Sequence, residues 1–296
     1  MVRHRAGYRW VVGVLGPGIG LLLAGLASSV VAQTHPGPMM NHAPVWSPTR
    51  NLIAFDSDRG GVPAVYIINP DERTLRPISD GRSPACCARW SRDGAHLNFE
   101  VDRDGTRQTL RVSVDGGSAV EVSGADRATE SQAADGAALV LVEQEGHSLV
   151  TLVADGLRVQ LTRGTWASQP AFSPNGQLIV YEDRDGDDIM ASRIVAMDRA
   201  GAGRRTLGLG TDPSWSPDGS LILFKTPTDQ VGGFGWQLAI GRPYGPLVTR
   251  LAPGVHPTWS PDGSRIAFMA ESGRTRTDIW VMSSDGATRR CLTCTH

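Results

Sequence analysis

A five-residue turn motif recurs along the chain at a nearly constant interval. Two copies read Trp-Ser-Pro-Asp-Gly, and four others diverge from that sequence to different degrees. The copies begin at Trp46, Trp90, Gln132, Phe172, Trp215 and Trp259. Successive copies are therefore 40 to 44 residues apart, and a fixed period in this range indicates a repeat architecture.

The motif itself predicts a tight turn between two short strands. Ser, Pro and Gly stand at places that a type I β-turn favours, since Pro presets φ and Gly permits a left-handed exit. An apolar, β-prone run follows each turn, as at residues 221–224, and two further strand-like runs complete each period. Four short strands in about 42 residues are typical of a propeller blade. We therefore expect an all-β, six-bladed β-propeller of four-stranded blades, at residues 44–79, 84–123, 128–162, 167–207, 211–252 and 255–293.

The repeated Trp-Ser-Pro-Asp-Gly turns, with the run 278–286 (Asp-Ile-Trp-Val-Met-Ser-Ser-Asp-Gly), resemble the WD40-like (PD40) repeats of TolB-type six-bladed propellers. The resemblance covers residues 44 to 293 and implies the propeller fold and a general capacity to bind proteins. TolB carries its own α/β domain before the propeller, and here only residues 33–43 stand in that place. We therefore do not transfer TolB's particular role to this chain.

The first 32 residues differ in kind from the rest. Arg3, Arg5 and Arg9 precede an uncharged run that ends in small residues before Gln33, the pattern of a cleaved secretory signal peptide. An uncleaved membrane anchor is the alternative, because the run is long. In either case we expect a periplasmic or extracellular propeller, with residues 33–43 as a linker and 44–294 as the folded domain.

Charge and motif content exclude several functions. Without the first 32 residues the chain has 26 basic and 30 acidic side chains, whereas nucleic-acid binding requires a basic surface. The nucleophile-elbow, zinc-protease, phosphate-loop and dinucleotide signatures are all missing from the sequence. We expect a monomeric binding protein without a cofactor, and an enzyme with a bound divalent metal is the alternative.

Four cysteines form two groups, Cys86 with Cys87 and Cys291 with Cys294. In an exported protein the default expectation is disulfide bonding, and four cysteines allow three pairings. A bridge between the groups would join the ends of the ring and stabilise it by roughly 5 kcal/mol, whereas two local pairs would contribute much less. A metal site built from Cys86, Cys87, Cys294 and His296 has suitable ligand types and is the remaining alternative.

One set of positions varies from repeat to repeat while the neighbouring motif recurs. Three residues before each motif stand Ala43, Cys87, Thr129, Gln169, Asp212 and His256, here called the mouth ring. A propeller places equivalent positions around one mouth of its channel. These side chains are either solvated strand ends without a role or a binding site. The binding hypothesis takes Gln169, Asp212 and His256 as its polar part, with Thr129 in the ring and Trp236 as an aromatic lid. We expect an Asp212–His256 pair to favour the charged forms of both groups.

The function predicted from the sequence is accordingly a non-enzymatic, exported propeller that recognises a protein or peptide of the cell envelope at its channel mouth. The alternative is a propeller enzyme, a lyase or hydrolase, with a metal-assisted site in the same ring. Contact with a membrane is expected only through an uncleaved N-terminal segment.

Overall fold

The computed structural model describes residues 40–122, 131–144, 146–163, 166–186, 188–228, 235–245, 248–272 and 276–294. All of them lie within one compact unit, Pro36–His296. The predicted signal peptide, most of the predicted linker, Thr129 and His296 lie outside the described residues. No helix in the described part of the chain has the length and apolar character needed to cross a membrane.

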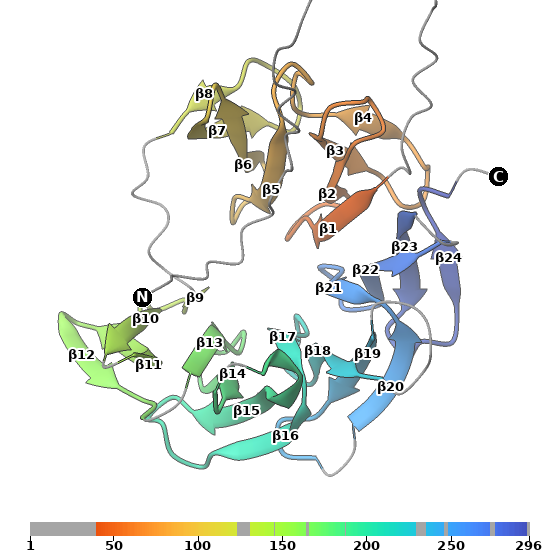
Figure 1. Cartoon of the computed structure of the whole chain (residues 1–296). Coiled ribbons are helices and arrows are strands. Elements are labelled where there is room, and N and C mark those ends of the chain that lie inside the picture. Colours follow the sequence, from red (N-terminus) through yellow and green to blue (C-terminus); the bar gives the residue numbers. More distant parts are fainter. Residues whose placement is uncertain are drawn as a thin grey trace, which may run out of the picture. The chain divides into compact units, whose positions relative to one another are not determined.

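Six antiparallel four-stranded sheets make up the fold, as the repeat predicts (Figure 1). The first three contain β1 Asn41–Trp46, β2 Ile53–Ser57, β3 Ala64–Ile68, β4 Leu75–Pro77, β5 Ala85–Trp90, β6 His96–Arg103, β7 Thr106–Ser113, β8 Val120–Glu121, β9 Ser131–Gln132, β10 Ala138–Gln144, β11 His147–Ala154 and β12 Leu157–Gln160. The last three contain β13 Trp166–Phe172, β14 Leu178–Arg184, β15 Arg193–Asp198, β16 Arg205–Leu209, β17 Thr211–Trp215, β18 Ile222–Pro227, β19 Trp236–Gly241, β20 Val248–Pro253, β21 Val255–Trp259, β22 Arg265–Glu271, β23 Thr277–Ser283 and β24 Arg289–Cys291. A short 3-10 helix, η2 Ile189–Ala191, precedes β15.

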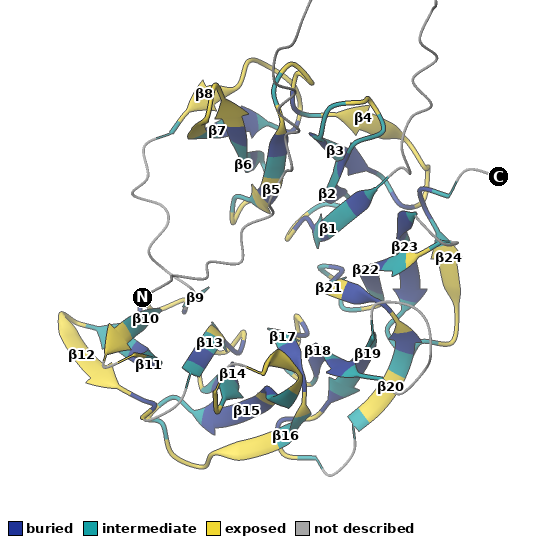
Figure 2. Cartoon of the chain, in the orientation of Figure 1, coloured by how far each residue is buried: buried dark blue, intermediate teal, exposed yellow. Residues whose placement is uncertain are grey.

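Each sheet is built from four consecutive strands, so every blade supplies its own outer strand, as expected. The first strand of each blade lies innermost and the fourth outermost (Figure 1). Burial is concentrated in the middle strands, whereas β4, β8 and β12 consist of exposed residues (Figure 2). The apolar core therefore lies between neighbouring blades, and the outer edge of the ring is exposed, including apolar side chains such as Leu157 and Val120.

The motif turn is held by its own serine. In the fifth blade, Ser216 Oγ donates to Asp218 Oδ1 over 2.6 Å and accepts from the Leu221 N–H over 2.9 Å. The same two contacts recur at the sixth-blade turn, between Ser260, Asp262 and Arg265. Hydrogen bonds from the serine hydroxyl and from nearby backbone N–H groups lower the pKa of Asp218 to about 2.

Consecutive motif turns also contact one another. Gly219 has φ +73°, and a Cβ added there would lie 3.3 Å from Cδ of Pro174 in the preceding turn. Gly263 repeats this arrangement with Pro217, at φ +70° and 3.4 Å. The left-handed backbone therefore favours glycine at this place, and the preceding proline packs closely against it.

The motif aromatic residues pack against the preceding blade. Trp215 joins Val180 and Ile194 of the fourth blade in one apolar cluster, and Trp46 joins residues of the sixth blade in another. Trp215 Nε1 also donates to the Ala171 carbonyl over 3.0 Å. The third blade has Gln132 at this place, and among the described residues no apolar cluster joins the second blade to the third.

The linker boundary predicted at residue 43 is too late, because β1 begins at Asn41. Asn41 is fully buried, and its backbone N–H donates to Thr277 Oγ1 of the sixth blade over 3.0 Å. Its Nδ2 donates to the Thr277 carbonyl over 2.8 Å. These bonds join the first blade to the last, at the seam where the sequence had suggested a disulfide.

Truncating a motif aromatic should destabilise the propeller far more than truncating its polar counterpart. We expect Trp215→Ala to lower the free energy of unfolding by about 3–5 kcal/mol through lost burial, and Gln132→Ala to change it by less than about 1 kcal/mol. Urea denaturation of the two variants measures the difference. Equal losses would contradict the assignment of the aromatic residues to the interfaces between blades.

Candidate functional site

The mouth ring occupies a backbone irregularity that recurs in every described copy. Five of its six residues are described, and all five have positive φ although none is glycine. The values are 46° at Ala43, 66° at Cys87, 49° at Gln169, 56° at Asp212 and 51° at His256. The pairing of the first strand with the second shifts register at each of these places. Each of these five residues thus lies in a β-bulge, a feature that redirects a side chain and interrupts strand pairing.

Gln169, Asp212 and Lys225 form one hydrogen-bonded and ionic chain across two blades. Gln169 Nε2 donates to Asp212 Oδ1 over 2.6 Å, and Lys225 Nζ lies 2.6 Å from the other carboxylate oxygen. Both charged side chains are largely buried, with 13% of Lys225 and 22% of Asp212 exposed. Two residues of the predicted site, Gln169 and Asp212, are therefore in contact, and the sequence-based prediction did not include Lys225, the cation that pairs with Asp212.

Burial and charge oppose each other at Asp212. Burial alone would raise the pKa of this carboxyl, but the charge and hydrogen bond of Lys225, together with Gln169, lower it below its usual value. Asp212 is consequently an anion and Lys225 its counter-ion at neutral pH.

His256 lies within electrostatic range of Asp212, but the expectation that both groups would be charged is wrong. Burial lowers the pKa of His256, and Lys225 and His42 lower it further, against the opposing effect of Asp212. The imidazole is therefore neutral near pH 7, because desolvation together with Lys225 and His42 outweighs the attraction of the Asp212 carboxylate. A neutral imidazole can both donate and accept a hydrogen bond.

Trp236 contributes to the same group from a different position than expected. The sequence placed it on a loop as a lid, whereas the structure makes it the first residue of β19, paired with Pro227. Lys225 Nζ lies 5.1 Å from the centre of its ring, within the range of a cation–π contact. Trp236 thus borders the ion pair from a strand, and residues 229–234 of the loop lie outside the described residues.

The sequence-based prediction also omitted charged residues in the second strand of two blades, opposite the mouth ring. Ser168, the neighbour of Gln169, pairs with Glu182, and Thr211, the neighbour of Asp212, pairs with Lys225. Glu182 is buried, and burial raises its pKa, with the charge of Asp212 adding to the effect. The sequence signal that could have identified both residues is a charged side chain that directly follows the apolar run of the second strand. Lys225 is in addition the only lysine in the chain.

The two groups of cysteines do not bridge each other. Cys86 is bonded to Cys87, and Cys291 to Cys294, so the predicted disulfides are present, and of the pairings that the sequence left open the structure has the two local ones. The first blade is joined to the sixth through Asn41, as described above.

Two groups of three metal-type ligands occur among the described residues, Asp56 with Cys86 and Cys87, and Asp278 with Cys291 and Cys294. In each group both sulfur atoms are engaged in a disulfide, so neither supplies the thiolates that a sulfur-based metal site requires. The predicted combination of Cys86, Cys87 and Cys294 is not assembled, because Cys294 is bonded to Cys291.

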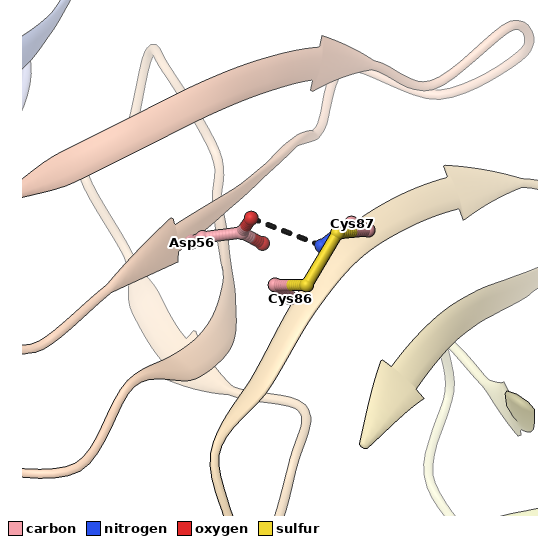
Figure 3. A group of neighbouring side chains, drawn as sticks. All are labelled: Asp56, Cys86 and Cys87. Atoms are coloured by element: carbon pink, nitrogen blue, oxygen red, sulfur yellow. Dashed lines mark hydrogen bonds between the residues drawn. A yellow bond between two sulfur atoms is a disulfide. The ribbon is translucent and has the colours of Figure 1, made fainter. Parts of the chain in front are cut away.

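The carboxylate of Asp56 lies within 4.8 Å of both sulfur atoms of the Cys86–Cys87 pair. Its Oδ2 accepts a hydrogen bond from the Cys87 N–H over 3.0 Å (Figure 3). Burial raises the pKa of Asp56 to about 6, although the backbone N–H groups of Cys87 and Ala88 oppose the shift.

Residues 20–210 match the family described as the TolB beta propeller domain, PD40. TolB from Acinetobacter baumannii superposes with a TM-score of 0.53 at 17% identity, covering 86% of this chain and 62% of TolB. The chain therefore spans less than two thirds of that protein. No curated protein matches the sequence.

Enzymes share the architecture as well. Pyrococcus horikoshii acylaminoacyl peptidase superposes with a TM-score of 0.59 at 13% identity, covering 86% of this chain and 52% of the peptidase. Oligogalacturonate lyase from Vibrio parahaemolyticus superposes with a TM-score of 0.50 at 12% identity, covering 86% of this chain and 78% of the lyase. At such identities the similarity concerns the fold alone.

The Asp212–Lys225 pair should be strongly coupled. We expect Lys225→Met to lower the free energy of unfolding by about 3 kcal/mol, because it leaves a largely buried carboxylate without its cation. Asp212→Asn in the Lys225→Met background should recover part of this loss. Urea denaturation of the two single variants and the double variant measures the coupling, and strictly additive losses would show that the two groups do not interact.

Proposed function

Because the chain belongs to the TolB beta-propeller family, we propose that it is an exported, non-enzymatic binding protein that holds a protein or peptide segment at its channel mouth. The observation that carries this proposal is the connected group of Gln169, Asp212 and Lys225, with His256 within electrostatic range of its two charges. These four side chains come from three consecutive blades, so one ligand at the mouth can contact all of them.

The chemistry of this group suits a peptide. A peptide backbone presents both N–H donors and C=O acceptors, and its side chains or termini add charges of either sign. The group offers an amide, a carboxylate, an ammonium and a neutral imidazole, with the aromatic face of Trp236 beside them. Such convergent polar groups beside an aromatic surface are typical of sites that orient a ligand.

The ion pair also gives the site a fixed geometry before binding. Asp212 is held on one side by Gln169 and on the other by Lys225, both at 2.6 Å. A preorganised site loses less conformational entropy when it binds, which raises affinity without additional contacts. The cell-envelope location of the ligand follows from the proposed export of the chain, for which residues 1–32 provide the signal.

Substitutions in the ring should abolish binding without unfolding the protein. We expect Asp212→Ala and His256→Ala to lose the envelope proteins or peptides that the immobilised parent retains, because each removes a group that the ligand contacts. Quantitative mass spectrometry of the retained proteins measures the loss, and circular dichroism verifies the fold.

The matched control is Arg158→Ala on the exposed outer strand β12, which lies away from the mouth and should retain the parent's partners. If Asp212→Ala and His256→Ala also retain them, the ligand binds elsewhere and the proposal fails.

A further inference from the structure

The Cys86–Cys87 disulfide does not have the properties of a structural staple. A disulfide stabilises a fold mainly by closing a loop in the unfolded chain, and the effect grows with loop length. Two adjacent cysteines close the smallest loop that a chain offers. The bond therefore adds almost nothing to stability through chain entropy, and its position in the fold becomes the relevant observation.

That position is the mouth ring. Cys87 is the mouth-ring residue of the second blade and has φ 66°. Cys87 is exposed, whereas Cys86 is half-buried. The bulge thus presents Cys87 to solvent and keeps its partner turned toward the first blade, where Asp56 lies (Figure 3). The second disulfide of the chain differs in this respect, since Cys291 and Cys294 are both half-buried.

We propose that Cys86–Cys87 is a thiol–disulfide exchange site at the channel mouth, on which an external dithiol is oxidised. A thiolate of the dithiol attacks the exposed Cys87 Sγ, the Cys86–Cys87 bond breaks, and the Cys86 sulfur leaves as a thiolate that then takes up a proton. The second thiolate of the dithiol attacks its own sulfur in the mixed disulfide and releases Cys87. Two electrons and two protons pass to the protein, which ends with two thiols, and the dithiol ends as a disulfide.

The class of substrate follows from the adjacency of the two cysteines. After the first attack the Cys86 thiolate remains beside the mixed disulfide and can re-form the original bond. An intramolecular reaction of this kind proceeds at a high effective concentration, so a monothiol is expelled before a second molecule arrives. A dithiol can compete with this reversal, because its second thiolate attacks the same mixed disulfide intramolecularly.

Asp56 is expected to restrain the exchange. Its carboxylate lies beside the sulfur that must leave as an anion, and a neighbouring negative charge disfavours a thiolate. Asp56→Asn keeps an acceptor for the Cys87 N–H and removes this charge.

The test compares the two disulfides within the same folded protein. The full-length mature protein is treated with dithiothreitol at pH 8, samples are blocked with iodoacetamide at intervals, and mass spectrometry follows each pair. We expect Cys86 and Cys87 to be alkylated at least about tenfold faster than Cys291 and Cys294, because attack requires access to sulfur. Circular dichroism should show no unfolding when only the first pair has reacted. Reduction of Cys291–Cys294 first, equal rates for both pairs, or unfolding that accompanies the first reduction would overturn the proposal.

A second measurement uses Asp56→Asn under the same conditions. At pH 8 Asp56 is ionised, so its replacement should accelerate alkylation of Cys86 and Cys87 several-fold while leaving Cys291 and Cys294 unchanged. An identical rate in the parent and the variant would contradict the departure of the Cys86 sulfur beside this carboxylate.

Discussion

The positive φ of the mouth-ring residues is the constraint from which the candidate site follows. A left-handed backbone costs an L-residue roughly 1–2 kcal/mol. All five described residues of the mouth ring have this conformation, and none of them is glycine. The bulge persists because the strand on each side of it is fixed, by pairing with the second strand and by the motif aromatic three residues later. Strain of this kind is retained where the surrounding structure determines the backbone, and it is concentrated at functional sites.

A conserved backbone with variable side chains explains how one repeat can build a specific site. The motif residues maintain the turn and the contact between blades, so they recur. The bulged residue contributes no pairing to the sheet and is free to differ from blade to blade. At Gln169 and Asp212 it carries a hydrogen-bonding group, at Cys87 a disulfide, and at Ala43 a methyl group. The two proposed chemistries, polar binding and thiol exchange, thus share one architectural position.

Local features of the structure could be predicted from the sequence, and long-range ones could not. The turn motif and its spacing predict the blades correctly, because a β-turn and a neighbouring aromatic are encoded within a few residues. The sign of φ at Ala43 or Gln169 is not encoded in the same way, since neither residue is of a type that favours positive φ. It follows from the pairing of whole strands.

The errors at the site have the same origin. Lys225 was missed as a partner of Asp212 because the contact joins two strands through a register shift. His256 was expected to be charged because the sequence indicates its neighbour Asp212 but not the desolvation and the charge of Lys225, which together lower the pKa of the imidazole. The pairing of the cysteines stayed open because the repeat does not specify how far apart the two groups lie in the ring; the structure has two local pairs, and Asn41 joins the first blade to the last.

Replacing Ala43 by glycine tests the backbone constraint most directly, because Ala43 has φ 46° and its methyl group is the smallest side chain in the ring. If the bulge holds this residue in a strained conformation, Ala43→Gly raises the free energy of unfolding by up to about 1 kcal/mol in urea denaturation. The same change at Ala270 in the regular strand β22 should lower it by about 0.5–1 kcal/mol. A loss of stability at Ala43 equal to that at Ala270 would contradict a strained, left-handed mouth ring.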